Sequence, residues 1–290
     1  MQIDLHLHSN YSDGYLTPTE LAQFIATQKI KIAALTDHHS INGIAEFSNI
    51  CQKLGIKTIT GVEIYCRLDQ KSFNILWYNF DNTSQEMREL LHDSQVCRYK
   101  LMKATLLKLQ EYGFEIKIEK VLSKYKNYIP LNHITGDILS IKHNVELVKK
   151  ENNLKKVHQN DVIVKYLRNP KIGKLHNHHI ELRQILELRK KIGGQLIICH
   201  PAKHPHSHIV NKELWENLKQ SGIDGAETLS PHHSYSAIIQ IQRLAQELNF
   251  IETGGSDFHC FENKNHLINS SLQYFKIDSD CLRKIKTVIG

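Results

Sequence analysis

The chain begins with a strand-like run in which a single leucine separates two histidines, His6 and His8. Side chains alternate between the two faces of a β-strand, so both imidazoles point the same way. Asp13 follows five residues after His8, beside Gly14, where a turn can bring its carboxylate back to that face. Imidazole and carboxylate are both ligands for divalent metals. In a chain with 19 histidines, however, this pair alone fits chance as well as it fits a metal site.

Further histidines and acidic residues follow short apolar runs along the chain. Each run reads as a buried strand, and at its end stands a residue that can bind a metal or move a proton. These residues are His38, Glu63, His200, Glu227, Asp257 and His259. In α/β barrels, the carboxyl ends of the strands are where the chemistry is placed. Their regular position favours one shared site over independent surface residues.

Seven candidate strands can be placed, near 2–7, 31–35, 57–60, 73–79, 195–199, 223–228 and 250–253. Helical patterns separate most of them, which predicts a mainly parallel sheet. One helix is expected to open with a Thr17–Glu20 capping box, a second to be capped by Ser40, and a third to cover 234–248. Chemistry at the strand ends favours closure of this sheet into a barrel.

The segment 82–192 interrupts the alternation of strands and helices. It begins with a long helical stretch at 84–112 and continues with helical patterns near 138–150 and 180–192. It is too long for a simple crossover, so it is expected to be an inserted helical subdomain between 1–81 and 193–290. Residues 97–191 carry 21 Lys/Arg and 9 Asp/Glu, and this excess suits either an anionic partner or a solvated lysine-rich surface.

The composition indicates the class of protein and the cellular compartment to expect. With 290 residues and 41% hydrophobic content, the chain can bury a substantial core. It contains neither a run long enough to span a membrane nor a signal-like N-terminus. The six cysteines form no Cys-x-x-Cys pair, so a reduced, cytoplasmic setting is expected. Cys199 and Cys260 lie beside candidate ligands, but small buried apolar residues explain them at least as well as reactive thiols do.

Together these motifs resemble the PHP (polymerase and histidinol phosphatase) phosphoesterases. The resemblance rests on residues 4–14, 18–21, 36–38, 61–63, 200–201, Glu227 with 233–234, and 254–259. Within that family, the chain looks most like the branch that removes phosphate from nucleoside 3′,5′-bisphosphates, some members of which trim short RNA from its 5′ end. The resemblance covers roughly 1–80 and 193–290.

The resemblance implies a distorted seven-stranded β/α barrel that binds two or three divalent ions. His6, His8, Glu63 and Asp257 would hold one ion, and Glu63 would bridge to a second ion that His200 also binds. Asp13, His38 and His259 would hold a third. Mixed nitrogen and oxygen ligands suit Zn, Mn or Fe without choosing among them.

The chain departs from the family pattern at two positions. Asn74 stands where the family often has a histidine, and an amide is a poorer ligand for such ions. In the insert, the family's Arg-Pro-His reads Leu131-Asn132-His133, so His133 remains without the arginine. Arg98 matches a family arginine and is a candidate phosphate contact alongside His133.

The leading hypothesis is a phosphoesterase that uses a metal-activated hydroxide on a nucleotide or a short 5′-phosphorylated oligonucleotide. His233 or His200 would protonate the leaving oxygen, and Asp13 belongs to the same catalytic group. One alternative is a phosphatase for a small metabolite such as histidinol phosphate. Another is a catalytically weakened nucleic-acid-binding module. No membrane or protein partner is expected.

Overall fold

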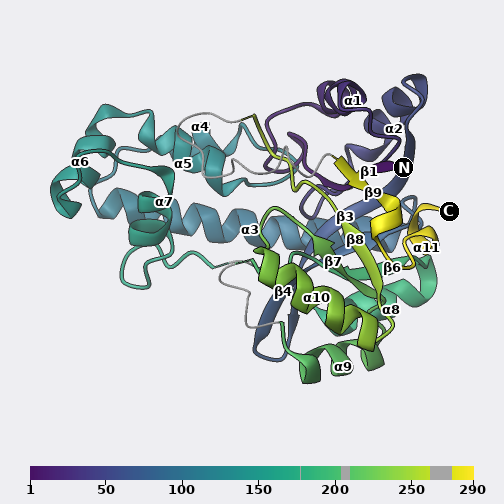
Figure 1. Ribbon diagram of the computed structural model, residues 1–290. Helices are drawn as coiled ribbons and strands as arrows, with labels where there is room; N and C mark the ends of the chain where they lie inside the picture. Colours follow the sequence, from purple (N-terminus) through teal and green to yellow (C-terminus); the bar gives the residue numbers. More distant parts are fainter. Residues whose placement is uncertain (177, 204–209, 262–275) are drawn as a thin grey trace. The chain divides into compact units, whose positions relative to one another are not determined.

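The computed structural model describes residues 1–176, 178–203, 210–261 and 276–290, which form two compact units (Figure 1). The first unit comprises Met1–Leu91 and His179–Gly290, and the second comprises His92–His178. These boundaries lie inside the expected insert, 82–192. The difference arises because apolar side chains from both ends of that segment pack in the core of the first unit; they are Met87, Leu91, Leu182, Ile185, Leu188 and Ile192.

The first unit is built on one sheet whose main strands run in the order β8-β7-β6-β4-β3-β2-β1. Their bounds are β1 (Gln2–Leu7), β2 (Ile32–Leu35), β3 (Lys57–Leu68), β4 (Lys71–Tyr78), β6 (Gln195–Ile198), β7 (Gly225–Leu229) and β8 (Ile251–Gly254). Short strands β9 (Ile277–Asp278) and β5 (Ile180–Glu181) pair with β1 and β3. A parallel bridge from Leu7 to Phe258 links the two ends of the sheet. The sheet is therefore a nearly closed barrel, as predicted.

Strand β4 differs from the mainly parallel arrangement that the sequence predicts. It pairs antiparallel with both β3 and β6. A two-residue turn at Asp69 and Gln70 joins β3 to β4, and Asp69 takes a left-handed conformation with φ 53°. Such a turn returns the chain directly beside the strand it has left, without a crossover helix. Strand β3 also extends eight residues past its expected end, so Glu63 lies within the strand.

Helices pack on the sheet through two apolar clusters. Helices α1 (Pro18–Thr27) and α2 (Ile44–Lys53) contribute to one, and α8 (Leu182–Ile192), α9 (Lys212–Ser221) and α10 (Tyr235–Glu247) to the other. A short helix α11 (Lys286–Ile289) follows near the C-terminus. The Thr17–Glu20 capping box on α1 is confirmed. No helix in the described ranges is long and apolar enough to cross a membrane.

The expected Ser40 cap on α2 is wrong. The helix begins at Ile44, after Gly43, and no side chain caps it. The reason lies in the preceding loop, where the His39 amide donates to the Glu63 carbonyl at 2.9 Å. This bond ties residues 37–40 to β3, so the chain turns into the helix only beyond them.

The second unit is helical, as the sequence predicts for this region. It contains most of α3 (Gln85–Glu111), which begins in the first unit, followed by α4 (Ile118–Leu122), α5 (Leu131–Leu139), α6 (Lys142–Asn152) and α7 (Gln159–Val162). A π-helical turn spans Ile163–Leu167. These helices share an apolar core of their own that includes Met102, Phe114, Ile134 and Leu167.

Candidate metal centre

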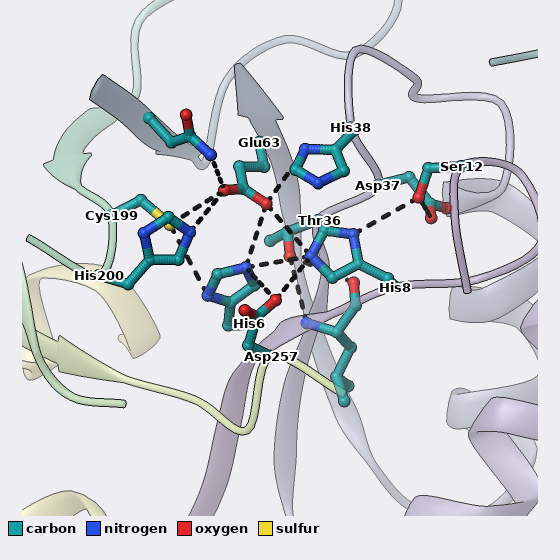
Figure 2. Close-up of polar contacts among 12 residues, drawn as sticks. His6, His8, Ser12, Thr36, Asp37, His38, Glu63, Cys199, His200 and Asp257 are labelled. Atoms are coloured by element: carbon teal, nitrogen blue, oxygen red, sulfur yellow. Dashed lines mark hydrogen bonds and ion pairs between the residues drawn. The ribbon is translucent and has the colours of Figure 1, made fainter. Parts of the chain in front are cut away.

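Four side chains from three parts of the barrel meet at one point (Figure 2). His6 and His8 come from β1 and the residue after it, Glu63 from β3, and Asp257 from the loop after β8. His6 Nε2 lies 3.1 Å from His8 Nε2 and 3.2 Å from both Glu63 Oε2 and Asp257 Oδ1. His8 Nε2 lies 3.2 Å from the same two oxygens. Five of the six edges of a tetrahedron thus have nearly equal length.

These four atoms fit a divalent metal ion. The centre of a tetrahedron with 3.2 Å edges lies about 2.0 Å from each corner, which is the length of a Zn–N or Zn–O bond. All four side chains are buried. Burial alone lowers the pKa of His8, but Asp257 and Glu63 outweigh it and raise that pKa to about 10. Without an ion, a proton on the imidazole therefore supplies the positive charge that the carboxylates require.

Glu227 holds His6 in this position. Its Oε1 lies 2.9 Å from His6 Nδ1, and its Oε2 accepts the backbone N–H of His200 at 2.8 Å. A carboxylate on the far nitrogen of a histidine fixes the tautomer and orients the other nitrogen. His200 and Asp257 both have positive φ, at 27° and 50°. Such strained backbone is typical of residues held for function.

A second cluster lies on the other side of His8 and contains Asp13, His38 and His259. Asp13 Oδ1 is 3.1 Å from His259 Nε2 and 3.7 Å from His8 Nδ1, and Asp13 Oδ2 is 3.7 Å from His38 Nε2. Burial lowers the pKa of His38 to about 4, so its imidazole is neutral and able to bind a metal. The structure brings together the three residues that the resemblance implies for a third ion.

A third cluster surrounds the other oxygen of Glu63. Its Oε1 lies 3.1 Å from His200 Nε2, 3.2 Å from Cys199 Sγ and 2.6 Å from Asn74 Nδ2. Asn74 turns its amide nitrogen, which is a donor, toward Glu63, so in this arrangement it supports the carboxylate and does not act as a ligand. Burial lowers the pKa of His200 well below its usual range, which leaves the imidazole neutral.

Two further residues at this site were not expected as functional residues from the sequence. Lys203 Nζ and His232 Nε2 lie 3.1 and 2.5 Å from Asp257 Oδ2. Burial alone lowers the pKa of Lys203, but Asp257 and Glu63 outweigh it and keep the ammonium charged. In the sequence, the only feature that could have pointed to a functional role for them is that they lie close to His200 and His233.

His233 does not face the cluster, in contrast to the expectation that it donates a proton there. Its Nδ1 lies 2.9 Å from the Thr228 carbonyl oxygen, and its Nε2 accepts the Ala202 N–H at 3.4 Å. Both ring nitrogens thus bond to backbone, and the neighbouring His232 reaches Asp257 instead. A chain reversal after β7 decides which of two adjacent histidines points inward, and the sequence does not show this.

The expected phosphate contacts Arg98 and His133 both lie in the second unit. Arg98 is buried, donates from Nε to the Ile129 carbonyl at 2.7 Å, and stacks on the Tyr128 ring at 4.4 Å. The His133 ring lies 6.1 Å from that of Tyr125. Within this unit, Arg98 therefore fixes the loop before α5.

A barrel with histidines and carboxylates gathered at strand ends is the architecture of a class of metal-dependent hydrolases. The family model described as PHP domain matches residues 4–181, and the chain belongs to this family. It is a metal-dependent phosphoesterase, as the sequence predicts.

Several relatives match most of the chain, among them an exoribonuclease and a phosphatase. A 5′-3′ exoribonuclease of Haemophilus influenzae is 28% identical over 256 residues, covering 88% of this chain and 89% of its own. A 3′,5′-nucleoside bisphosphate phosphatase of Chromobacterium violaceum is 24% identical over 258 residues, covering 89% and 87%.

Solved structures share the fold, and two of them illustrate the likeness. An amidohydrolase from Chromobacterium violaceum, with bound sulfate and no metal, superposes with a TM-score of 0.71 at 23% identity, covering 89% of this chain and 88% of its own. A putative metal-dependent phosphoesterase from Bifidobacterium adolescentis gives a TM-score of 0.74 at 18% identity, covering 96% and 98%.

Proposed function

We propose that this enzyme hydrolyses a phosphate ester of a nucleotide, either a nucleoside 3′,5′-bisphosphate or a short 5′-phosphorylated RNA. The observation that carries the proposal is the donor set around Glu63, whose two oxygens each face a separate group of ligands. The names of the two relatives support the substrate class, because both act on phosphorylated nucleotides or RNA.

The residues of the chain would act as follows. His6, His8, Glu63 and Asp257 would hold one ion, Glu63 with His200 a second, and Asp13, His38 and His259 a third. Ions bound there would supply an acidified water and positive charge for the phosphate oxygens. Asp257 would orient both Lys203 and His232 through its Oδ2.

Lys203 would bind the phosphate, and His232 would protonate the leaving oxygen. The Lys203 ammonium is partly exposed and remains charged, so it would bind a phosphate oxygen. Burial lowers the pKa of His232, and Lys203 lowers it further. A phosphate dianion beside the ring would raise this pKa again, so that His232 would protonate the leaving alkoxide.

The test compares three substrates on protein reloaded with Mn²⁺ or Zn²⁺. Phosphate release is measured from a nucleoside 3′,5′-bisphosphate, from a 5′-phosphorylated short RNA and from histidinol phosphate. We expect kcat/KM to be highest for one of the first two, and to fall at least about 100-fold in Asp257→Asn. A matched control is His143→Ala, which removes an exposed histidine of the second unit and leaves the rate unchanged.

The other outcomes of this assay separate the alternatives. A preference for histidinol phosphate would replace the nucleotide proposal with a small-metabolite phosphatase. RNA binding that weakens steeply with salt, without turnover at any metal concentration, would indicate the nucleic-acid-binding module instead.

A further inference from the structure

Cys199 lies beside Glu63 and His200, the residues proposed above to hold a second ion. Strands β3, β4 and β6 are neighbours, and Glu63, Asn74 and Cys199 share one face of the sheet. The register fixes this arrangement, because the Cys199 N–H donates to the Asn74 carbonyl at 2.9 Å. On the opposite face, Ile64, Ile75 and Ile198 pack in the apolar core beneath the helices.

The surroundings of the sulfur are partly polar. Cys199 Sγ lies 3.2 Å from Glu63 Oε1 and 3.9 Å from both His6 Nδ1 and Glu227 Oε2, and the side chain is buried. Its Sγ, the His200 Nε2 and a Glu63 oxygen all lie within 4.8 Å of one another, close enough to share an ion. Sulfur, nitrogen and oxygen atoms at this spacing match the donor set of a zinc-type site.

The orientation of Asn74 leaves room for Cys199 as a metal ligand. With the amide nitrogen of Asn74 directed at Glu63, an ion between Glu63 and His200 has only two of these neighbouring side chains as ligands. We propose that Cys199 is the third protein ligand of this ion, binding as a thiolate. On binding, the S–H bond breaks, the proton passes to water, and the sulfur electron pair forms the bond to the metal.

This inference rests on the metal dependence in the proposed function, and it adds a consequence for metal choice. Thiolate is a soft, negatively charged ligand, whereas Mn²⁺ and Mg²⁺ prefer oxygen. The second site should therefore select Zn²⁺ over Mn²⁺. Replacing Cys199 should weaken Zn²⁺ binding at this site by at least about tenfold and change Mn²⁺ binding less.

The test uses Co²⁺ as the probe and no substrate. Metal-free protein is reloaded with Co²⁺, and the near-ultraviolet thiolate-to-cobalt charge-transfer band and the bound metal are measured. We expect the band in the wild-type protein, its loss in Cys199→Ala and Cys199→Ser, and one equivalent less of bound Co²⁺. The matched control is Cys66→Ala, because Cys66 is also buried but lies on the opposite face of β3.

Either of two results would overturn the proposal. One is a fully loaded wild-type protein without the band, a result that needs no variant to fold. The other is a band that persists in Cys199→Ala, which would make the cysteine a packing residue. Protein that shows the Cys199-dependent band but hydrolyses no nucleotide would contradict only the proposed substrate.

Discussion

At the scale of single residues, Glu63 connects the parts of the centre. Its Oε2 faces His6 and His8, and its Oε1 faces His200 and Cys199. A carboxylate with a separate ligand group at each oxygen can bridge two cations. Burial raises the pKa of Glu63, but His38 and His6 outweigh it and keep that pKa well below its usual value, so Glu63 is ionised.

The protonation of Asp4 makes the stability of the folded protein depend on pH. Its Oδ1 accepts backbone N–H groups from Ser256 at 2.9 Å and His6 at 3.2 Å, while its buried Oδ2 has no hydrogen-bond partner among the residues that the structure describes. Burial raises the pKa of Asp4 from 3.8 to about 7, despite these hydrogen bonds. The folded protein therefore retains a proton that the unfolded chain loses.

We therefore predict that the contribution of Asp4 to stability falls as the pH rises from 4 to 7 in metal-free protein, and that Asp4→Asn removes this contribution. Stability from a raised pKa is complete below the unfolded value and is lost as the pH rises through the folded one. A pKa that differs by one between the folded and unfolded states corresponds to about 1.4 kcal/mol, so the effect is a few kcal/mol at most. Urea unfolding across this pH range measures it, and parallel curves for the two proteins would contradict it.

At the scale of elements, the close approach of β1 to the loop after β8 holds the candidate ligands His6 and Asp257 near each other. A Cβ added at Gly255 would lie 2.4 Å from His6 Cβ and 2.5 Å from His6 N. Both distances are far shorter than van der Waals contact, so only glycine lets the two segments meet. This contact sets the position of His6 relative to Asp257.

Gly255→Ala should therefore displace β1, lower Zn²⁺ affinity at least about tenfold and destabilise the protein by about 1–3 kcal/mol. Binding titration and urea unfolding measure the two effects. The control is Gly136→Ala in α5, where an added Cβ comes no closer than 3.4 Å to another atom and alanine favours the helix. Unchanged zinc affinity in Gly255→Ala would show that the contact does not position His6.

The elements also show how far the sequence predicts the structure. Apolar runs locate the seven main strands, and most of the histidines and acids that follow them are brought together by the structure as candidate ligands. Pairing direction is not encoded in such runs, so the antiparallel β4 and the long β3 were not predicted. The choice between His232 and His233, and the contacts of Lys203, depend on loop geometry that local sequence does not specify.

At the scale of the whole molecule, metal binding would join distant parts of the chain. His6 and His8 lie at the start of the sequence and Asp257 near its end, and the bridge from Leu7 to Phe258 closes the barrel between them. An ion held by these residues binds only the folded barrel, so it stabilises the folded state. The metal centre and the closure of the barrel are therefore expected to be linked.

The metal centre is tested most directly by calorimetric titration of metal-free protein with Zn²⁺ in buffers of different ionisation enthalpy. Because the pKa of His8 is about 10 in the absence of metal, zinc must displace its proton, and affinity should be higher at pH 8 than at pH 6. We predict tight binding with net proton release, and at least about tenfold weaker binding in His8→Ala. Binding of equal strength in His8→Ala, or no proton release, would contradict the assignment of this site as a metal centre.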